Sequence, residues 1–210
     1  MKCKICNSNT YIIYDEQFDM DYHRCEKCAF IYEDPKHHID LSNEKAEYDT
    51  HNNSIEDEGY VNMFKRFMDA FEPFVSGQSV LEYGSGPEPV FSQVLRQSDY
   101  QVTSYDPFYL PDLSYLCKSY DLITSTEVFE HFVEPMTEVE KLVGLLNEGG
   151  ILAVMTQFPK DDEHFKKWWY RRDKTHISFF TIESFKYIAE IYGLKVVYHN
   201  DKDYMIFQKS

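Results

Sequence analysis

The chain is poor in positive charge and has no long hydrophobic run. Among its 210 residues, 36 are acidic and 21 are lysine or arginine, which gives a formal net charge of −15. Proteins that bind bulk polyanions normally carry a basic face, so this deficit argues against nucleic acid as a partner. No apolar run approaches the roughly 20 residues of a membrane-spanning helix, and the first residues, MKCKIC, contain no apolar signal region. We therefore expect a cytoplasmic protein that makes no membrane contact.

The composition is that of a folded protein with a substantial core. Hydrophobic residues make up 43% of the chain and aromatic residues 17%, which argues against disorder. The length suffices for one domain and a small appendage. We expect three parts: an amino-terminal module over residues 1–40, a linker and an amphipathic helix over 41–72, and the main domain over 73–210.

The amino-terminal part contains four of the five cysteines, arranged in two pairs. Cys3 and Cys6 form one C-x-x-C motif, and Cys25 and Cys28 form the second. This spacing is typical of a zinc ribbon, and a closed shell of four thiolates indicates a structural zinc rather than a catalytic one. Two disulfides are the alternative, which a reducing cytosol disfavours. Such a short module buries little surface, so we expect metal binding to supply much of its stability.

The most informative segment of the main domain is a hydrophobic strand that breaks into a glycine turn, SVLEYGSG at residues 79–86. Gly84 and Gly86 permit positive φ angles and a close approach of a ligand to the backbone. In a doubly wound sheet such a turn lies at the carboxyl edge, where ligands bind. The third glycine of a dinucleotide fingerprint is replaced by Pro89, and Glu82 beside the turn would repel a pyrophosphate but attract a cation.

This segment resembles motif I of the class I S-adenosylmethionine (SAM) methyltransferases, in which an acid precedes the glycine turn. Three further segments match the same family in order: QVTSYD at 101–106, YDLITSTEVFEH at 120–131 and LLNEGGILAVMT at 145–156. A four-cysteine ribbon before a compact domain is likewise similar to a group of bacterial methyltransferases. The resemblance implies an α/β fold with a Rossmann-like sheet. It also implies SAM as the cofactor, bound by Glu82, Gly84, Ser85, Gly86, Asp106 and Thr126.

The chain departs from the family after Asp106, where a helix and a third strand normally lie. This segment is short and contains two prolines, so we expect the third strand to be reduced or missing. Phe108 or Tyr109 either covers the adenine or packs as part of a surface loop. At the carboxyl end, a capped helix over 181–192 precedes an antiparallel hairpin over 194–208, which is another feature of class I methyltransferases.

The linker before the amphipathic helix is polar. Residues 41–59 are either a solvated connection or a segment folded over the pocket. In the second case Tyr48, His51, Asn52 and Asn53 would contribute to the site.

Side chains suited to proton transfer follow the fourth and fifth strands of the expected sheet. Glu127, Glu130 and His131 read E-x-x-E-H, and on a helix that begins near Glu127 they share one face. His176 lies in the loop after the next strand, and neighbouring strands bring their following loops together over the sheet edge. Methyl transfer requires a nucleophile aligned with the methyl group and removal of its proton. We therefore predict that these four residues form one catalytic cluster.

Three interpretations of this cluster are open. Two carboxylates and two imidazoles could hold Mg²⁺ or Mn²⁺, an arrangement similar to that of small-RNA 2′-O-methyltransferases. His131 could act as a metal-free general base, in keeping with a resemblance to ubiquinone-type O-methyltransferases. The two glutamates could instead stabilise a helix N-terminus through its dipole.

One dense basic cluster, WWYRRDK at residues 168–174, interrupts the acidic chain. It is either a solvated turn or a site for a phosphate or carboxylate of the substrate, with Arg171 and Arg172 as the binding groups. Trp169 could stack on a planar substrate group or be buried in the core.

These observations predict a SAM-dependent methyltransferase that acts on a small hydroxylated or acidic metabolite, by O-methylation with glutamate- and histidine-assisted deprotonation. An RNA methyltransferase that grips RNA with its ribbon is one alternative, similar to some rRNA guanine methyltransferases. A SAM-binding protein without turnover is the other. The methyl acceptor and the oligomeric state stay open.

Overall fold

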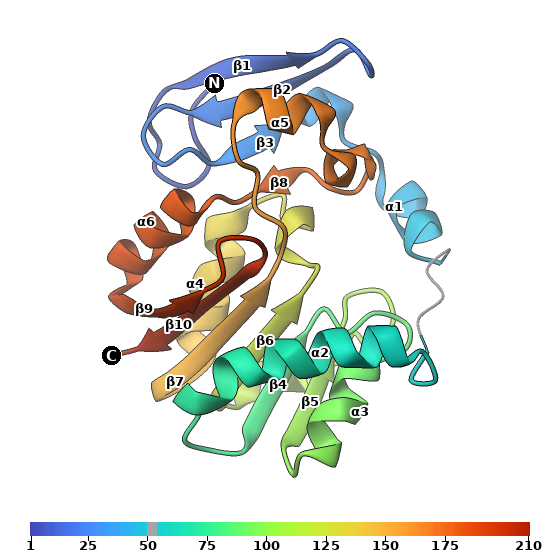
Figure 1. Cartoon of the computed structure of the whole chain (residues 1–210), viewed down its shortest axis with the longest axis vertical. Helices are drawn as coiled ribbons and strands as arrows, with labels where there is room; N and C mark the ends of the chain where they lie inside the picture. The colour runs from blue at the N-terminus through green and yellow to red at the C-terminus, as the bar shows by residue number, and fades with distance from the viewer. Residues whose placement is uncertain (50–53) are drawn as a thin grey trace.

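Two β-sheets lie one above the other along the long axis of the molecule (Figure 1). The computed structural model describes residues 1–49 and 54–210, so that His51, Asn52 and Asn53 lie outside the described residues. Within these ranges, none of the helices has the length and apolar character needed to cross a membrane.

The larger sheet has six strands in the order β5-β4-β6-β7-β10-β9. Its strands are β4 (Ser79–Tyr83), β5 (Gln101–Tyr105), β6 (Tyr120–Thr126), β7 (Leu146–Met155), β9 (Leu194–His199) and β10 (Tyr204–Lys209). The first four in this order, from β5 to β7, are parallel, whereas β10 is antiparallel to both β7 and β9. The predicted Rossmann-like sheet with a carboxyl-terminal antiparallel hairpin is therefore confirmed.

The sheet ends at β5, as the short segment after Asp106 predicted. The described residues that follow form an isolated bridge between Asp106 and Leu110 and the 3₁₀ helix η3 (Leu113–Cys117), and no described strand pairs with the outer edge of β5. Pro107 and Pro111 restrict the backbone there and remove two amide donors, which disfavours both the missing helix and the missing strand.

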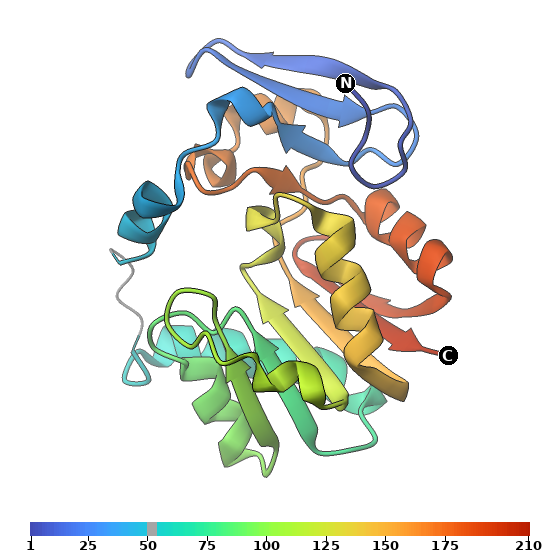
Figure 2. The ribbon, with the colours of Figure 1, turned by 180° about the vertical axis from the view of Figure 1, so that it is seen from behind.

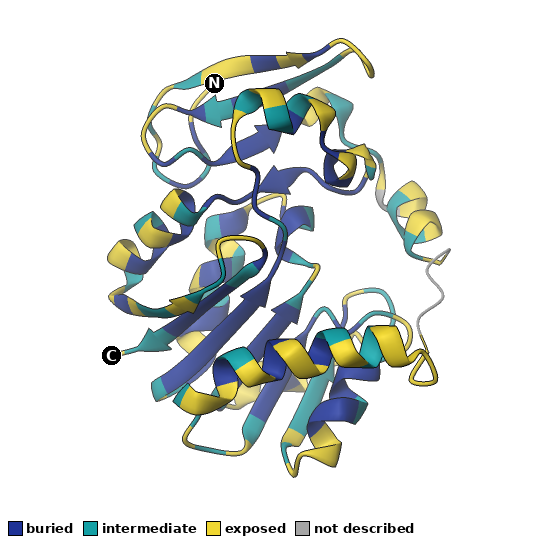
Figure 3. Ribbon diagram, viewed as in Figure 1, coloured by how far each residue is buried: buried dark blue, intermediate teal, exposed yellow. Residues whose placement is uncertain are grey.

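Helices cover both faces of the larger sheet (Figures 1 and 2). On one face lie α2 (Glu58–Phe71) and α3 (Val90–Gln97), and on the other lie α4 (Pro135–Leu145) and α6 (Ile182–Tyr192). The buried stripe of α2 packs against α3 and the sheet through Phe64, Phe67, Met68 and Phe71. The central strands β4, β6 and β7 are largely buried between the helices, whereas the edge strands β5 and β9 and the outer sides of the helices are more exposed (Figure 3). This amphipathic pattern places the core on both faces of the sheet.

The smaller sheet is antiparallel and has the order β1-β2-β3-β8. Its strands are β1 (Thr10–Asp15), β2 (Met20–Cys25), β3 (Ile31–Glu33) and β8 (Ser178–Phe179). We call the unit that it forms with the cysteine cluster the ribbon. Because β8 comes from the loop after β7, the ribbon sheet is completed by the main domain. The described chain also contains α1 (Leu41–Tyr48), α5 (Asp162–Lys167) and the 3₁₀ helices η1 (Pro35–His37), η2 (Glu72–Phe74), η4 (Phe129–His131) and η5 (Trp169–Arg172).

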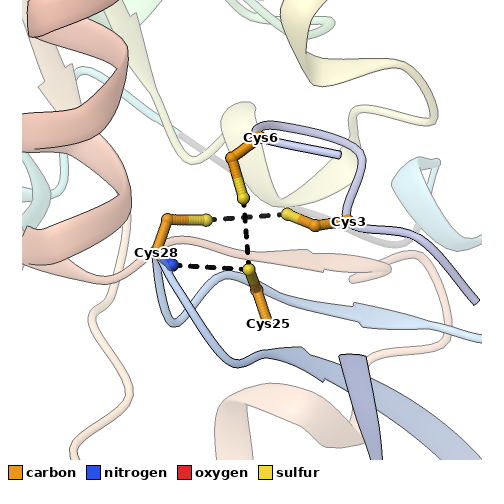
Figure 4. A group of neighbouring side chains, drawn as sticks. All are labelled: Cys3, Cys6, Cys25 and Cys28. Atoms are coloured by element: carbon orange, nitrogen blue, oxygen red, sulfur yellow. Dashed lines mark hydrogen bonds between the residues drawn. The ribbon is translucent and has the colours of Figure 1, made fainter. Parts of the chain in front are cut away.

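The four cysteines of the two C-x-x-C motifs meet beside the ribbon sheet with their sulfurs turned toward one another (Figure 4). The Sγ atoms are 3.5 Å apart for Cys3 and Cys28 and 3.3 Å apart for Cys6 and Cys25, and all four cysteines are free thiols. A disulfide needs a separation of about 2.05 Å. The amides of Lys27 and Cys28 each donate to the sulfur of Cys25 at 3.3 Å, so the turn itself orients this ligand. The cluster therefore has the form of a four-thiolate metal site.

Candidate active site

A cavity of about 790 Å³ opens at the carboxyl ends of β4, β5 and β6. Its volume is within the range of small-molecule and cofactor sites, about 300 to 1,000 Å³. The predicted site residues that line it are Glu82, Gly84, Ser85, Gly86, Asp106, Thr126, Glu127, His131, Trp169 and His176. The topology thus brings together segments that are widely separated in the sequence, as expected for the ligand edge of a doubly wound sheet.

The glycine turn after β4 forms one wall of the cavity. Gly84 has a φ of 84°, and a Cβ atom at this position would lie 2.2 Å from Val128 Cγ2, so that only glycine fits. Gly86 has a φ of 67°, but here a Cβ would meet no atom within 4 Å. The backbone at Gly86 therefore faces open space that a ligand can occupy. The buried hydroxyl of Ser85 has no hydrogen-bond partner among the described residues and lies in the same wall.

Asp106 is held at the end of β5 by backbone amides. Its Oδ2 accepts from the amide of Gly86 at 2.9 Å, and its Oδ1 accepts from the amides of Phe108 at 2.9 Å and Tyr109 at 3.1 Å. These bonds fix the carboxylate against the glycine turn, where an acid can accept hydrogen bonds from ribose hydroxyls. Phe108 and Tyr109 both line the cavity beside it.

Glu82 lies near the carboxyl end of strand β4, lines the cavity and is only 3% exposed. Burial raises the pKa of its carboxyl to about 7, although the hydroxyl of Ser92 donates a hydrogen bond to it and opposes this shift. Burial disfavours the ionised form because the charge loses its hydration. A cationic ligand beside Glu82 would restore that stabilisation.

A second wall contains a buried tyrosine between two glutamates. The hydroxyl of Tyr170 lies 2.5 Å from Glu130 Oε1 and 3.0 Å from Glu127 Oε2, and Thr156 donates to Glu130 Oε2 at 2.9 Å. Burial, together with the charge of Glu130, raises the pKa of Glu127 well above its usual range. Glu127 also has a φ of 54°, a strained conformation for a residue other than glycine. The tyrosine thus links two carboxyl groups that would otherwise repel each other.

Both imidazoles of the cluster present the same nitrogen to Glu130. Nδ1 of His131 lies 2.9 Å from the carbonyl of Thr175, and Nδ1 of His176 lies 2.7 Å from the carbonyl of Tyr170. A carbonyl only accepts, so each neutral ring carries its proton on Nδ1 and leaves Nε2 as an acceptor. The two Nε2 atoms lie 3.9 Å and 4.0 Å from Glu130 Oε1. Burial lowers the pKa of His176, which favours the neutral ring.

Three of the four residues predicted as catalytic thus form a compact set. The ligand atoms of Glu130, His131 and His176 all lie within 4.8 Å of one another, and Glu127 joins them through Tyr170. The expected helix near Glu127 does not form. The structure has instead the short 3₁₀ helix η4, and it is the loop before β8 that carries His176 to the others.

The two arginines of the basic cluster do not line the cavity. Arg171 is 2% exposed and forms an ion pair with Asp15 of β1, and Arg172 is exposed on the surface without lining the cavity. The structure therefore brings neither arginine to the cavity, and the guanidinium of Arg171 instead pairs with a buried carboxylate of the ribbon. Trp169 does lie at the cavity, with 63% of its surface exposed.

Two tyrosines, Tyr48 and Tyr170, complete the wall of the site, and of these only Tyr170 was not predicted from the sequence. Tyr170 lies within WWYRRDK, among charged residues typical of a solvated turn, so the sequence gives no sign that its hydroxyl is buried. The ring centroid of Tyr48 lies 5.2 Å from that of His131, in an edge-on arrangement, and 5.6 Å from that of Phe108, with the rings tilted, so α1 forms part of the cavity wall. The hypothesis of a linker folded over the pocket thus holds for Tyr48, whose only sequence signal was an aromatic residue in a polar stretch.

The sequence matches the methyltransferase domain family over residues 56–199, and the chain belongs to this family. Together with the sheet order, the match identifies a class I SAM-dependent methyltransferase domain. No curated protein has significant sequence similarity to the chain.

Solved structures of the same fold include methyltransferases of different substrates. The mitomycin 7-O-methyltransferase MmcR superposes with a TM-score of 0.55 at 9% identity, over 71% of this chain and 54% of its own. An O-methyltransferase family protein from Burkholderia thailandensis gives 0.52 at 16% identity, over 73% of this chain and 56% of its own. Magnesium protoporphyrin IX methyltransferase from Synechocystis, solved with bound S-adenosylhomocysteine (SAH), superposes with a TM-score of 0.53 at 14% identity, over 80% of this chain and 94% of its own. The chain thus spans little more than half the length of the first two, and the likeness is one of fold.

Proposed function

We propose that this protein transfers a methyl group from SAM to a hydroxyl group of a small molecule. The observation that carries the proposal is the pair of imidazoles, each with its Nδ1 hydrogen-bonded to a carbonyl and its Nε2 free beside Glu130, at the cavity lined by the glycine turn. A neutral Nε2 in this position can take a proton from an acceptor hydroxyl.

The glycine turn and two acids suit SAM, which supplies a methyl group on a positively charged sulfur. We place its methionine part along Gly84 and Gly86, where the backbone faces open space, and its ribose at Asp106. The ionised carboxylate of Glu82 would face the positive charge. With this placement the methyl group points toward the second wall, where His131 and His176 lie.

His131 is the proposed base. Its Nε2 is an acceptor at the cavity wall, and Glu130 at 3.9 Å stabilises the positive charge that the ring gains with the proton. His176 and Tyr170 orient Glu130 from the other side. Glu127, with its raised pKa, serves as a neutral partner of Tyr170 rather than as a second negative charge.

The same residues fit a divalent cation. Glu130, His131 and His176 offer one carboxylate oxygen and two imidazole nitrogens, and the carbonyls that hold each Nδ1 orient the free nitrogens as in metal sites with ordered outer contacts. Of Mg²⁺ and Mn²⁺, imidazole ligands favour Mn²⁺, since Mg²⁺ prefers oxygen ligands. A bound cation would lower the pKa of an acceptor hydroxyl.

The charges around the cavity favour a hydroxylated acceptor over an acidic one. Among the described residues that line it, Lys141 is the one lysine or arginine, and its Nζ lies 2.7 Å from Glu138 Oε2. Several acidic residues also line it, including Glu44, Glu134 and Asp173. A carboxylate acceptor would find no unpaired cation there.

We further propose that Cys3, Cys6, Cys25 and Cys28 bind one structural zinc. The four sulfurs already converge, with separations close to the roughly 3.8 Å expected in a tetrahedron with Zn–S bonds of about 2.3 Å. With four protein ligands the ion would have no open position for a substrate.

An acceptor screen with methyl-labelled SAM tests the function. Wild-type protein and His131→Ala are incubated in parallel with fractions of small metabolites and with RNA, and labelled product and SAH are measured. We expect labelled product in a metabolite fraction, and a decrease of about 10²- to 10⁴-fold in His131→Ala while SAM still binds. Treatment with EDTA distinguishes a bound cation from a metal-free base. Loss of activity that Mn²⁺ restores supports the cation, and unchanged activity supports His131 alone as the base. Equal turnover in both proteins would refute the role of His131, and label in RNA alone would refute the acceptor class.

A further inference from the structure

The segment before β8 is bonded to both the ribbon and the catalytic cluster. We call residues 157–177, which carry Tyr170 and His176, the active-site loop. The amide of Ile177 donates to the carbonyl of Glu130 at 2.9 Å, and the carbonyl of Ile177 accepts from the amide of Glu33 of β3 at 2.9 Å. A single residue of this loop is thus hydrogen-bonded on one side to the ribbon sheet and on the other to a residue of the catalytic cluster.

A buried ion pair ties the active-site loop to the far edge of the ribbon sheet. Arg171 directly follows Tyr170, and its guanidinium pairs with Asp15 at the end of β1; the two side chains are 0% and 3% exposed. The guanidinium also donates to the carbonyls of Phe165, at 2.8 Å, and Lys166. The guanidinium of Arg171 therefore connects the segment around Phe165 and Lys166 of the active-site loop to strand β1 of the ribbon.

Stability alone is a weak reason for such a pair. Removing two charges from water costs several kcal/mol per ion, and replacement by apolar side chains of similar volume is often neutral or stabilising. A pair with directional hydrogen bonds nevertheless defines one position for the groups that it joins. The ion pair fixes the backbone at Arg171, next to Tyr170. The hydroxyl of Tyr170 must lie between Glu127 and Glu130 to contact both.

We propose that Asp15 and Arg171 are positioning residues, through which the ribbon holds the Tyr170 hydroxyl between the two glutamates and directs Nε2 of His176 toward the cavity. The catalytic meaning of this inference rests on the proposed function, whereas its geometry does not. The ribbon is then a structural part of the active site rather than a separate binding module. A change in the ribbon should disturb the proton-transfer groups and leave binding at the glycine turn intact.

The tautomer of His176 reports the position of the active-site loop. In the native arrangement its proton is on Nδ1, because the carbonyl of Tyr170 accepts it. We would record the ring-nitrogen NMR signals of the SAH-loaded protein at a pH where the ring is neutral. The wild type is compared with the double variant Asp15→Leu/Arg171→Met, in which apolar side chains replace the pair. We expect the double variant to fold and to bind SAH as before, while His176 shifts to a mixture of both tautomers.

A second buried pair in the ribbon provides the matched control. Asp34 lies 3.1 Å from His23 Nε2, and the two side chains bond within the ribbon. Asp34→Asn should leave the His176 signals unchanged. A folded double variant in which His176 keeps its Nδ1 proton would overturn the proposal, and so would an equal shift in the control. If the double variant does not fold, Asp15→Asn replaces it: His176 should again shift to a mixture of tautomers, and the control Asp34→Asn should not. The measurement uses no acceptor, so a failure of the proposed methyl transfer would leave its result unaffected.

Discussion

Glu82 offers a quantitative test of the cofactor site, because burial raises its pKa from the usual 4.5 to about 7. The folded protein therefore holds this proton more tightly than the unfolded chain does. Its contribution to the free energy of unfolding is fully present below pH 4.5, falls as the pH rises from about 4.5 to 7, and stays lost above. The rise in pKa corresponds to about 3 kcal/mol. Glu82→Gln cannot ionise, so its stability relative to the wild type should increase by about this amount between pH 4.5 and 8.

SAM binding should change with pH in the opposite direction. If the positive charge of SAM requires ionised Glu82, the affinity of the wild type should fall about tenfold, or 1.4 kcal/mol, between pH 8 and pH 6. Glu82→Gln should bind SAM more weakly at pH 8 and show a smaller change with pH. Calorimetric titrations of both proteins at several pH values measure this difference, and the variant corrects for the titration of SAM itself.

Glu33 of β3 is the matched control, because burial raises its pKa to about 7 as well. It lies in the ribbon and does not line the cavity. Glu33→Gln should also remove part of the loss of stability above pH 4.5, as measured by urea denaturation, yet leave the pH dependence of SAM binding unchanged. A Glu82→Gln variant that retains the full wild-type pH dependence of SAM affinity, or a Glu33→Gln variant that lacks it, would contradict a role of Glu82 in binding SAM.

Three further predictions concern the cofactor and the ribbon. Asp106→Ala should weaken SAM binding by about 1–3 kcal/mol in calorimetry, the scale of hydrogen bonds to a charged acceptor, and an unchanged Kd would contradict the placement of the ribose. Gly84→Ala should lower the free energy of unfolding by at least about 1–3 kcal/mol, because a side chain there has a strained φ and meets Val128; a stable variant with unchanged SAM affinity would show that the turn is not close-packed. Metal analysis of the purified protein should find one zinc per chain, and the variant Cys28→Ser should lose the zinc and unfold at a lower temperature. Wild-type protein that is folded but metal-free in reducing buffer would disprove the zinc site.

Local sequence patterns predicted the parts of this protein whose structure depends on neighbouring residues. The glycine turn is one, since the positive φ angles at Gly84 and Gly86 favour residues without a Cβ. The cysteine cluster is another, because each C-x-x-C turn places two sulfurs together whatever surrounds it. The missing third strand followed from a segment too short and too rich in proline to form it.

The arrangement around the histidines required more than the local pattern. The E-x-x-E-H spacing predicted a shared helix face, but Glu127 adopts a left-handed conformation and only the 3₁₀ helix η4 follows. Glu130 and His131 meet His176 because the sheet order places β6 beside β7. Strand adjacency was the inference that succeeded, and helical periodicity was the one that did not.

The sequence by itself determined the class of the domain, the cofactor edge of the sheet and the four-cysteine site, because these depend on strand order and short spacings that are legible along the chain. Only the tertiary structure decided where the basic cluster and its aromatic neighbours lie. The sequence left Arg171 as either part of a solvated turn or a substrate-binding cation, whereas in the structure it is buried and pairs with Asp15, which is remote in the chain. Tyr170 gains its place between Glu127 and Glu130 from the same contact. Long-range electrostatic pairing of this kind leaves no local signal, since the cost of burying a charge becomes visible only when its partner is seen.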